Sequence, residues 1–184
     1  MQELLNLWLP VLVSSIAVFF ASFLAWMVVG HHKPDWRELP DERRVGELLQ
    51  NAGVQPGRYL FPLAQNREQM ADPVKQQLLK SGPWGTINLF PAAPAMGRNL
   101  ILTWLFYLTT SLFVAYLGTL ALEPGATFLQ VFQVTGTAGI LAYCFGFVPN
   151  AIWFGTPLRA VLMDVLDGLT FGLLTGAVFG ILWP

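Results

Sequence analysis

Two carboxylates, Asp164 and Asp167, stand inside a long apolar stretch of the chain. A carboxylate near mid-membrane costs about 2.5–3.5 kcal/mol on insertion scales, so it faces a bundle interior, pairs with another group or becomes protonated. Three interpretations stay open: an ion or proton site, a buried hydrogen-bonded pair that fixes helix packing, and exposure at the membrane interface. The groups expected at matching depth are Arg98, Thr103, Tyr107, Tyr143 and Arg159.

A second group of chemically capable residues is His31, His32 and Asp35. Imidazole and carboxylate ligate transition metals, so these three are the candidate metal ligands of the chain. Adjacent histidines rarely reach one ion from regular structure, and bis-histidine haem ligation needs histidines on facing helices. We therefore expect His31, His32 and Lys33 to anchor a helix end at the membrane interface, and we expect no metal or cofactor.

Enzymatic alternatives rest on incomplete motifs. The string from Asp164 to Gly168 resembles the opening of the CDP-alcohol phosphotransferase motif, which implies a lipid-modifying membrane enzyme. The chain departs from that motif, because Phe171 and Gly172 stand where Ala-Arg belongs and no second acidic pair follows. An intramembrane aspartyl protease takes its two catalytic aspartates from two helices, whereas Asp164 and Asp167 lie on one, which argues against that activity. The single cysteine, Cys144, excludes an intrachain disulfide and a cysteine-based metal site.

The composition identifies the setting in which these residues must work. The chain has 184 residues, of which 54% are hydrophobic and 11% charged, and its mean hydropathy is +0.53. A net charge of −1 with no basic block gives no footprint for nucleic acid. Most of the charges fall between residues 33 and 98. These values exclude an ordinary soluble enzyme and indicate an integral membrane protein.

Hydropathy predicts an all-α membrane protein with four transmembrane helices. Each apolar run is long enough to cross a hydrocarbon core of about 30 Å at 1.5 Å per residue. We expect the first run to be retained rather than cleaved as a signal peptide. Residues 151–154 form a short interfacial piece between the last two runs. The four predicted spans are residues 4–29, 100–122, 128–148 and 158–183.

The basic residues predict the orientation. Nine of them lie between the first and second spans, and Arg159 opens the fourth. The positive-inside rule therefore makes the insert cytoplasmic and places both termini in the periplasm. Tryptophans agree with this orientation, since Trp8 and Trp183 mark the outer interface and Trp26 and Trp153 the inner one.

The insert, residues 31–98, is predicted to be a small mixed α/β cap that divides a first helix, residues 1–30, from helices 2–4, residues 99–184. Asp41 and Gly53 mark the start and stop of one helix, and Asp72-Pro73 begin another. Residues 58–61 and 86–90 read as short strands that can pair. So few large apolar groups bury little surface, which favours contact with the membrane face or with a partner.

The fourth span carries a stripe of glycines at every fourth position. Small residues at this spacing let helix backbones approach closely in a membrane. We expect the stripe to serve packing within the bundle, and contact with another subunit is the alternative. Its members are Gly168, Gly172, Gly176 and Gly180.

Residues 31–36, 57–62 and 153–159 together are similar to a family of uncharacterised small bacterial inner-membrane proteins. That resemblance implies a bacterial source and the four-span layout, but no activity. We expect a non-catalytic accessory subunit or assembly factor of a larger membrane complex. Its partners would be the lipid bilayer and other membrane subunits or a second copy. The alternative is a small ion- or proton-coupled transporter or channel that uses Asp164 and Asp167, and a lipid-modifying enzyme is more distant.

Overall fold

The computed structural model describes residues 2–184, which divide into two compact units. The first, called the bundle unit here, comprises residues up to Arg37 together with Ala95–Pro184. The second, called the insert unit, is Glu38–Pro94. The segment that carries His31, His32 and Asp35 therefore belongs to the bundle unit, whereas the sequence analysis assigned it to the insert.

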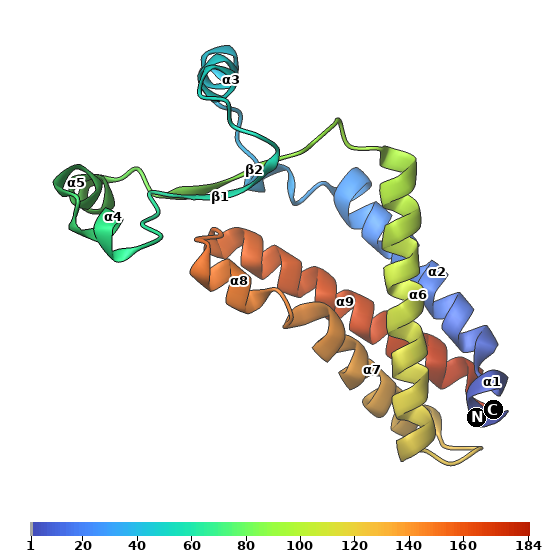
Figure 1. The fold of residues 1–184 in the computed structure, drawn as a ribbon. Helices are drawn as coiled ribbons and strands as arrows, with labels where there is room; N and C mark the ends of the chain where they lie inside the picture. The colour runs from blue at the N-terminus through green and yellow to red at the C-terminus, as the bar shows by residue number, and fades with distance from the viewer. Residues whose placement is uncertain (1) are drawn as a thin grey trace. The chain divides into compact units, whose positions relative to one another are not determined.

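The bundle unit contains four helical stretches that are long and apolar enough to cross a membrane, as predicted (Figure 1). Helix α2 contacts α6 and α9, and α7 also contacts both α6 and α9, so the four helices close a ring. A short helix, α1 (Gln2–Asn6), precedes α2. The long stretches are α2 (Trp8–Phe23) with the π-helical η1 (Leu24–Val29), α6 (Met96–Ala121), α7 (Phe128–Cys144) with α8 (Val148–Trp153), and α9 (Leu158–Leu182).

The third span differs from its prediction near its end. Helix α7 stops at Cys144, and a separate helix, α8, begins at Val148. Proline is tolerated in the first turn of a helix, where its missing N–H has no intrahelical partner, so Pro149 starts α8 rather than breaking it. The short piece between the last two spans is thus α8, which begins three residues earlier than the predicted residues 151–154.

Glycines of α9 face α7 within the chain. A Cβ built on Gly172 would lie 2.5 Å from the backbone nitrogen of Ile140, and one on Gly176 would lie 2.8 Å from the Cα of Gly136. These separations are shorter than real carbon contacts, so only glycine permits this approach. The stripe fixes α9 against α7.

The interior of the bundle changes character along its length. At the end where α1 lies, Leu7, Val114 and Phe179 belong to a buried apolar cluster. Towards the other end, Tyr107 and Phe171 pack with Val18. Buried hydroxyl groups lie among these clusters, on four different helices: Ser14, Ser15, Thr110, Ser111, Thr135 and Thr175.

The insert unit confirms the predicted helix caps and strands. The side chain of Asp41 accepts a hydrogen bond from the backbone of Arg44 at 2.9 Å, and Asp72 accepts one from Val74 at 2.9 Å. The two strands pair antiparallel. Helix α4 was not predicted; it is a single short turn capped by Asn66. The elements are α3 (Glu42–Asn51), β1 (Gly57–Phe61), α4 (Arg67–Ala71), α5 (Pro73–Ser81) and β2 (Gly85–Leu89).

Candidate functional site

A turn at the end of η1 positions the two histidines. Gly30 ends the helix with φ of +65°, a left-handed conformation that strongly favours glycine. A short 3₁₀ helix, η2 (Lys33–Asp35), follows at once. The backbone therefore reverses after the first span and directs His31 and His32 back towards the start of α9.

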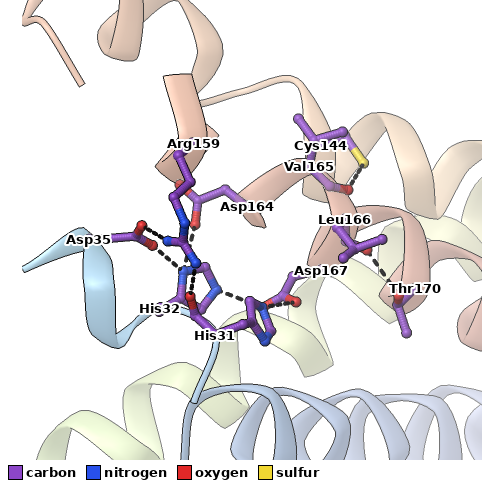
Figure 2. Close-up of polar contacts among 10 residues, drawn as sticks. All are labelled: His31, His32, Asp35, Cys144, Arg159, Asp164, Val165, Leu166, Asp167 and Thr170. Atoms are coloured by element: carbon purple, nitrogen blue, oxygen red, sulfur yellow. Dashed lines mark hydrogen bonds and ion pairs between the residues drawn. The ribbon is translucent and has the colours of Figure 1, made fainter. Parts of the chain in front are cut away.

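Both histidines contact the same carboxylate, Asp167 of α9 (Figure 2). The Nε2 atom of His31 lies 2.9 Å from Oδ1 of Asp167, and the Nε2 atom of His32 lies 3.1 Å from Oδ2. Two imidazoles thus share the two oxygens of one carboxylate. His32 and Asp167 are buried, with 3% and 8% of their surfaces exposed.

Asp35 and Arg159 hold the two histidines through contacts other than those with Asp167. Oδ2 of Asp35 lies 3.0 Å from Nδ1 of His32. The guanidinium of Arg159 donates from Nη1 to Oδ1 of Asp35 and from Nη2 to the backbone carbonyl of His31, the latter at 2.8 Å. Arg159, in the first turn of α9, therefore holds the histidine segment against the helix that carries Asp167.

Two further groups complete the surroundings of His32. Its ring stacks on the indole of Trp26, with centroids 4.1 Å apart and planes inclined by 15°. Oδ1 of Asp164 lies 4.0 Å from Nδ1 of His32, and this carboxylate is more exposed than Asp167. His32 is thus packed on one face by an aromatic ring and surrounded at its edges by carboxylates.

The surroundings of His32 raise its pKa above the ordinary value of 6.5. Burial is the largest influence and lowers the pKa, because it disfavours the charged imidazolium. Hydrogen bonds to Asp167 and Asp35, together with the charges of Asp167 and Asp164, act in the opposite direction and outweigh burial. The protonated form of His32 is therefore stabilised relative to a free imidazole.

The cluster carries an excess of negative charge. Asp35, Asp164 and Asp167 stand against a single guanidinium, Arg159, which leaves a formal charge of −2 while both imidazoles are neutral. An ionised carboxylate can only accept hydrogen bonds, and both ring nitrogens of His32 face carboxylates. A neutral imidazole has one N–H and cannot satisfy both contacts. The site is therefore built for added positive charge.

An open cavity of about 500 Å³ adjoins the cluster. Asp164 and Asp167 line it, together with aromatic rings that include Trp26 and Tyr107. The buried hydroxyl of Tyr143, a residue that also lines the cavity, has no hydrogen-bond partner among the described residues. The cavity thus combines carboxylates at one part of its wall with an aromatic lining.

The structure changes the pairing expected from the sequence. His32, which was expected to anchor a helix end at the membrane interface, is buried within the bundle unit, because the turn at Gly30 folds it onto Asp167. Both histidines reach one carboxylate because they lie in a turn and not in regular helix. Arg159 pairs with Asp35 instead of with Asp164 or Asp167.

The remaining candidates divide between the cavity wall and other places. Tyr107 and Tyr143 line the cavity beside Asp167. Thr103 instead donates its hydroxyl to the carbonyl of Asn99 on its own helix. Arg98 is exposed near the start of α6, and in the described part of the chain it forms no ion pair with either aspartate. Sequence reasoning therefore omitted His31 and His32 as partners of Asp167, although they follow the first span at the same end as Arg159.

Comparison of the chain with protein-family models, with curated proteins and with solved structures gives no match. Function is accordingly argued from the geometry of the histidine–carboxylate cluster and the cavity beside it.

Proposed function

We propose that the protein is a small ion-coupled membrane transporter whose cation site is the cluster of His31, His32 and Asp167. The observation that carries this proposal is the uncompensated charge of the cluster, in which Asp167 and His32 are buried. Burying such charge is unfavourable unless cations accompany it. Either two protons or one divalent ion would bring the formal charge to zero.

The topology supports a role at one face of the membrane. The cluster joins the end of the first span to the start of the last one, where the basic residues of the chain also concentrate. Under the positive-inside rule this is the cytoplasmic end, with both termini in the periplasm of a bacterial inner membrane. The cavity would then admit ions from the cytoplasm.

Transport also requires access from the opposite face. There the interior is filled by the apolar cluster that contains Leu7, Val114 and Phe179. We therefore propose a second conformation in which this end opens while the ion-bearing end closes. The buried hydroxyl groups between the two ends, including Thr175 and Ser111, supply polar partners along that route.

Ion flux in proteoliposomes tests the proposal. The full-length chain is reconstituted, and proton and divalent-cation flux are followed with trapped fluorescent indicators. We expect flux above empty vesicles, its loss in Asp167→Asn, and its retention in Asp72→Asn. The control makes the same chemical change at a helix cap of the insert unit, where asparagine is equally suitable. Flux equal to that of empty vesicles, or unchanged by Asp167→Asn, would refute the transporter.

A second candidate, an accessory subunit or assembly factor, is favoured by the insert unit. No residue of Glu38–Pro94 is buried, and Val74, Trp84 and Phe90 are each more than 60% exposed. A unit this poor in core gains stability from a surface that covers it. Native mass spectrometry of the gently extracted complex tests this candidate. Recovery of only monomers or self-dimers would count against it.

A further inference from the structure

We infer that His31, His32 and Asp167 form a binding site for a divalent transition-metal ion of the zinc class. One ring nitrogen from each histidine and one carboxylate oxygen of Asp167 lie within 4.8 Å of one another. The inference rests on the proposed cation site and specifies the ion that occupies it.

The spacing of the donor atoms suits a tetrahedral ion. Zinc bonds of about 2.0–2.1 Å place neighbouring ligand atoms about 3.3 Å apart. The Nε2 atoms of His31 and His32 lie 2.9 Å from Oδ1 and 3.1 Å from Oδ2 of Asp167, and one donor atom from each of the three residues lies within 4.8 Å of the other two. Rotation of the imidazoles about their side-chain bonds then brings both towards the ion.

The outer contacts match those that orient metal-bound histidines. Such a histidine donates its second N–H to a carboxylate or carbonyl, which fixes the tautomer and strengthens the ligating nitrogen. Nδ1 of His32 lies 3.0 Å from Asp35, and Arg159 in turn donates to Asp35. With the proton on Nδ1, the lone pair of His32 is on Nε2, which faces Asp167. The support for a metal ligand is therefore already in place.

The donor set selects the class of ion. Two imidazoles and one carboxylate favour zinc and its neighbours, whereas Mg²⁺ and Ca²⁺ prefer oxygen ligands. The single thiol does not belong to the set, because the Sγ of Cys144 lies 3.6 Å from the carbonyl of Val165 and donates to it. Three protein ligands leave a fourth position, which water can fill.

The charge of the ion also fits the cluster. A divalent ion compensates the formal charge of −2, whereas an alkali ion would leave half of it beside the buried Asp167. The same ion would replace the protons that the histidines need in order to contact Asp167. Metal and protons are thus alternative occupants of one site.

Direct titration and X-ray absorption test the site without any variant. Full-length protein, purified without a histidine tag and stripped with a chelator, is titrated with zinc in excess magnesium. We expect one zinc per chain and an absorption spectrum with two imidazoles and oxygen neighbours. The chain contains only two histidines, so imidazole scattering identifies His31 and His32. Absence of stoichiometric binding, or a spectrum without imidazole, would overturn the inference.

Variants assign the ligands one at a time. His31→Gln and Asp167→Asn should each weaken zinc binding by more than about 100-fold, which exceeds the usual effect of an outer contact. Asp72→Asn should bind as the wild type does. Binding by His31→Gln or Asp167→Asn with wild-type affinity would show that the zinc lies elsewhere.

The flux and binding measurements fail separately. Proton flux that depends on Asp167 but comes without zinc binding would retain the transporter and overturn the metal site. Stoichiometric zinc at the two imidazoles without flux of any ion would retain the metal site and refute the transporter.

Discussion

Asp35 offers the most informative substitution, because it touches the proposed metal only through another residue. Its Oδ2 lies 3.0 Å from Nδ1 of His32, and its Oδ1 accepts from Arg159. In Asp35→Asn the carboxylate charge is lost, and the new amide can present either its oxygen or its NH₂ group to His32. When the NH₂ group faces Nδ1, the ring proton moves to Nε2 and blocks that nitrogen as a ligand.

The magnitude follows from what the substitution leaves intact. All three proposed ligands, His31, His32 and Asp167, are still present, so zinc should still bind. Loss of an outer-shell partner typically weakens metal affinity by about 10–100-fold, or about 1.4–2.7 kcal/mol. Arg159 keeps its contact with the carbonyl of His31, which limits displacement of the segment. We therefore expect a weakened site with unchanged stoichiometry.

Calorimetric zinc titration at about pH 8.5, well above the ordinary histidine pKa of about 6.5, measures this loss with little competition from protons. A merely structural role for Asp35 would leave the pH profile unchanged. In contrast, removal of its hydrogen bond should lower the pKa of His32. When the zinc affinity of each protein is expressed relative to its own plateau at high pH, the affinity of Asp35→Asn should therefore begin to fall at a lower pH than that of the wild type. Affinity within about threefold of the wild type, together with an unshifted profile, would refute the positioning role.

Three more outcomes follow. Hydrogen bonds to Asp167 and Asp35 outweigh burial and raise the pKa of His32. As the pH is lowered, zinc affinity in the wild type should therefore begin to fall while the pH is still above 6.5, and it should then drop about tenfold for each further unit of acidification, as titration at a series of pH values will show. Gly172→Ala should cost about 1–3 kcal/mol in detergent unfolding, since its Cβ meets Ile140, whereas Gly97→Ala should cost nothing because no atom lies within 4 Å. Gly30→Ala, at φ of +65°, should cost about 1 kcal/mol and weaken zinc binding. Equal stability of the two helical variants, or full zinc affinity in Gly30→Ala, would contradict these expectations.

Local patterns were sufficient to predict the elements. The four spans follow from apolar runs, and the caps at Asp41 and Asp72 follow from hydrogen bonds between residues two or three positions apart. The two paired strands of the insert unit could likewise be predicted from short segments that lie between turns. Helix α4 escaped prediction because one capped turn carries no apolar periodicity.

The site required information that the sequence does not express locally. His31 and Asp167 are 136 positions apart, and their contact depends on the turn at Gly30 and on the rotation of α9 about its axis. One signal was available, since the histidines directly follow the first span and Asp167 lies nine residues after Leu158, the first residue of α9. Matching depth directed attention to Arg98 and Arg159, the second of which pairs with Asp35 instead.

The two halves of the cluster are held by different kinds of contact, which makes fold and site separable. Asp167 is carried by α9, which the glycine stripe fixes against α7 at distances that admit no added carbon. The imidazoles are carried by a short turn, held to α9 through Asp35, Arg159 and the contacts with Asp167. Gly172→Ala should therefore lower the free energy of unfolding while zinc is still bound by the same ligands. Gly30→Ala should reduce the free energy of zinc binding by more than it reduces the free energy of unfolding. The opposite pattern would mean that the ligands depend on helix packing and not on the turn.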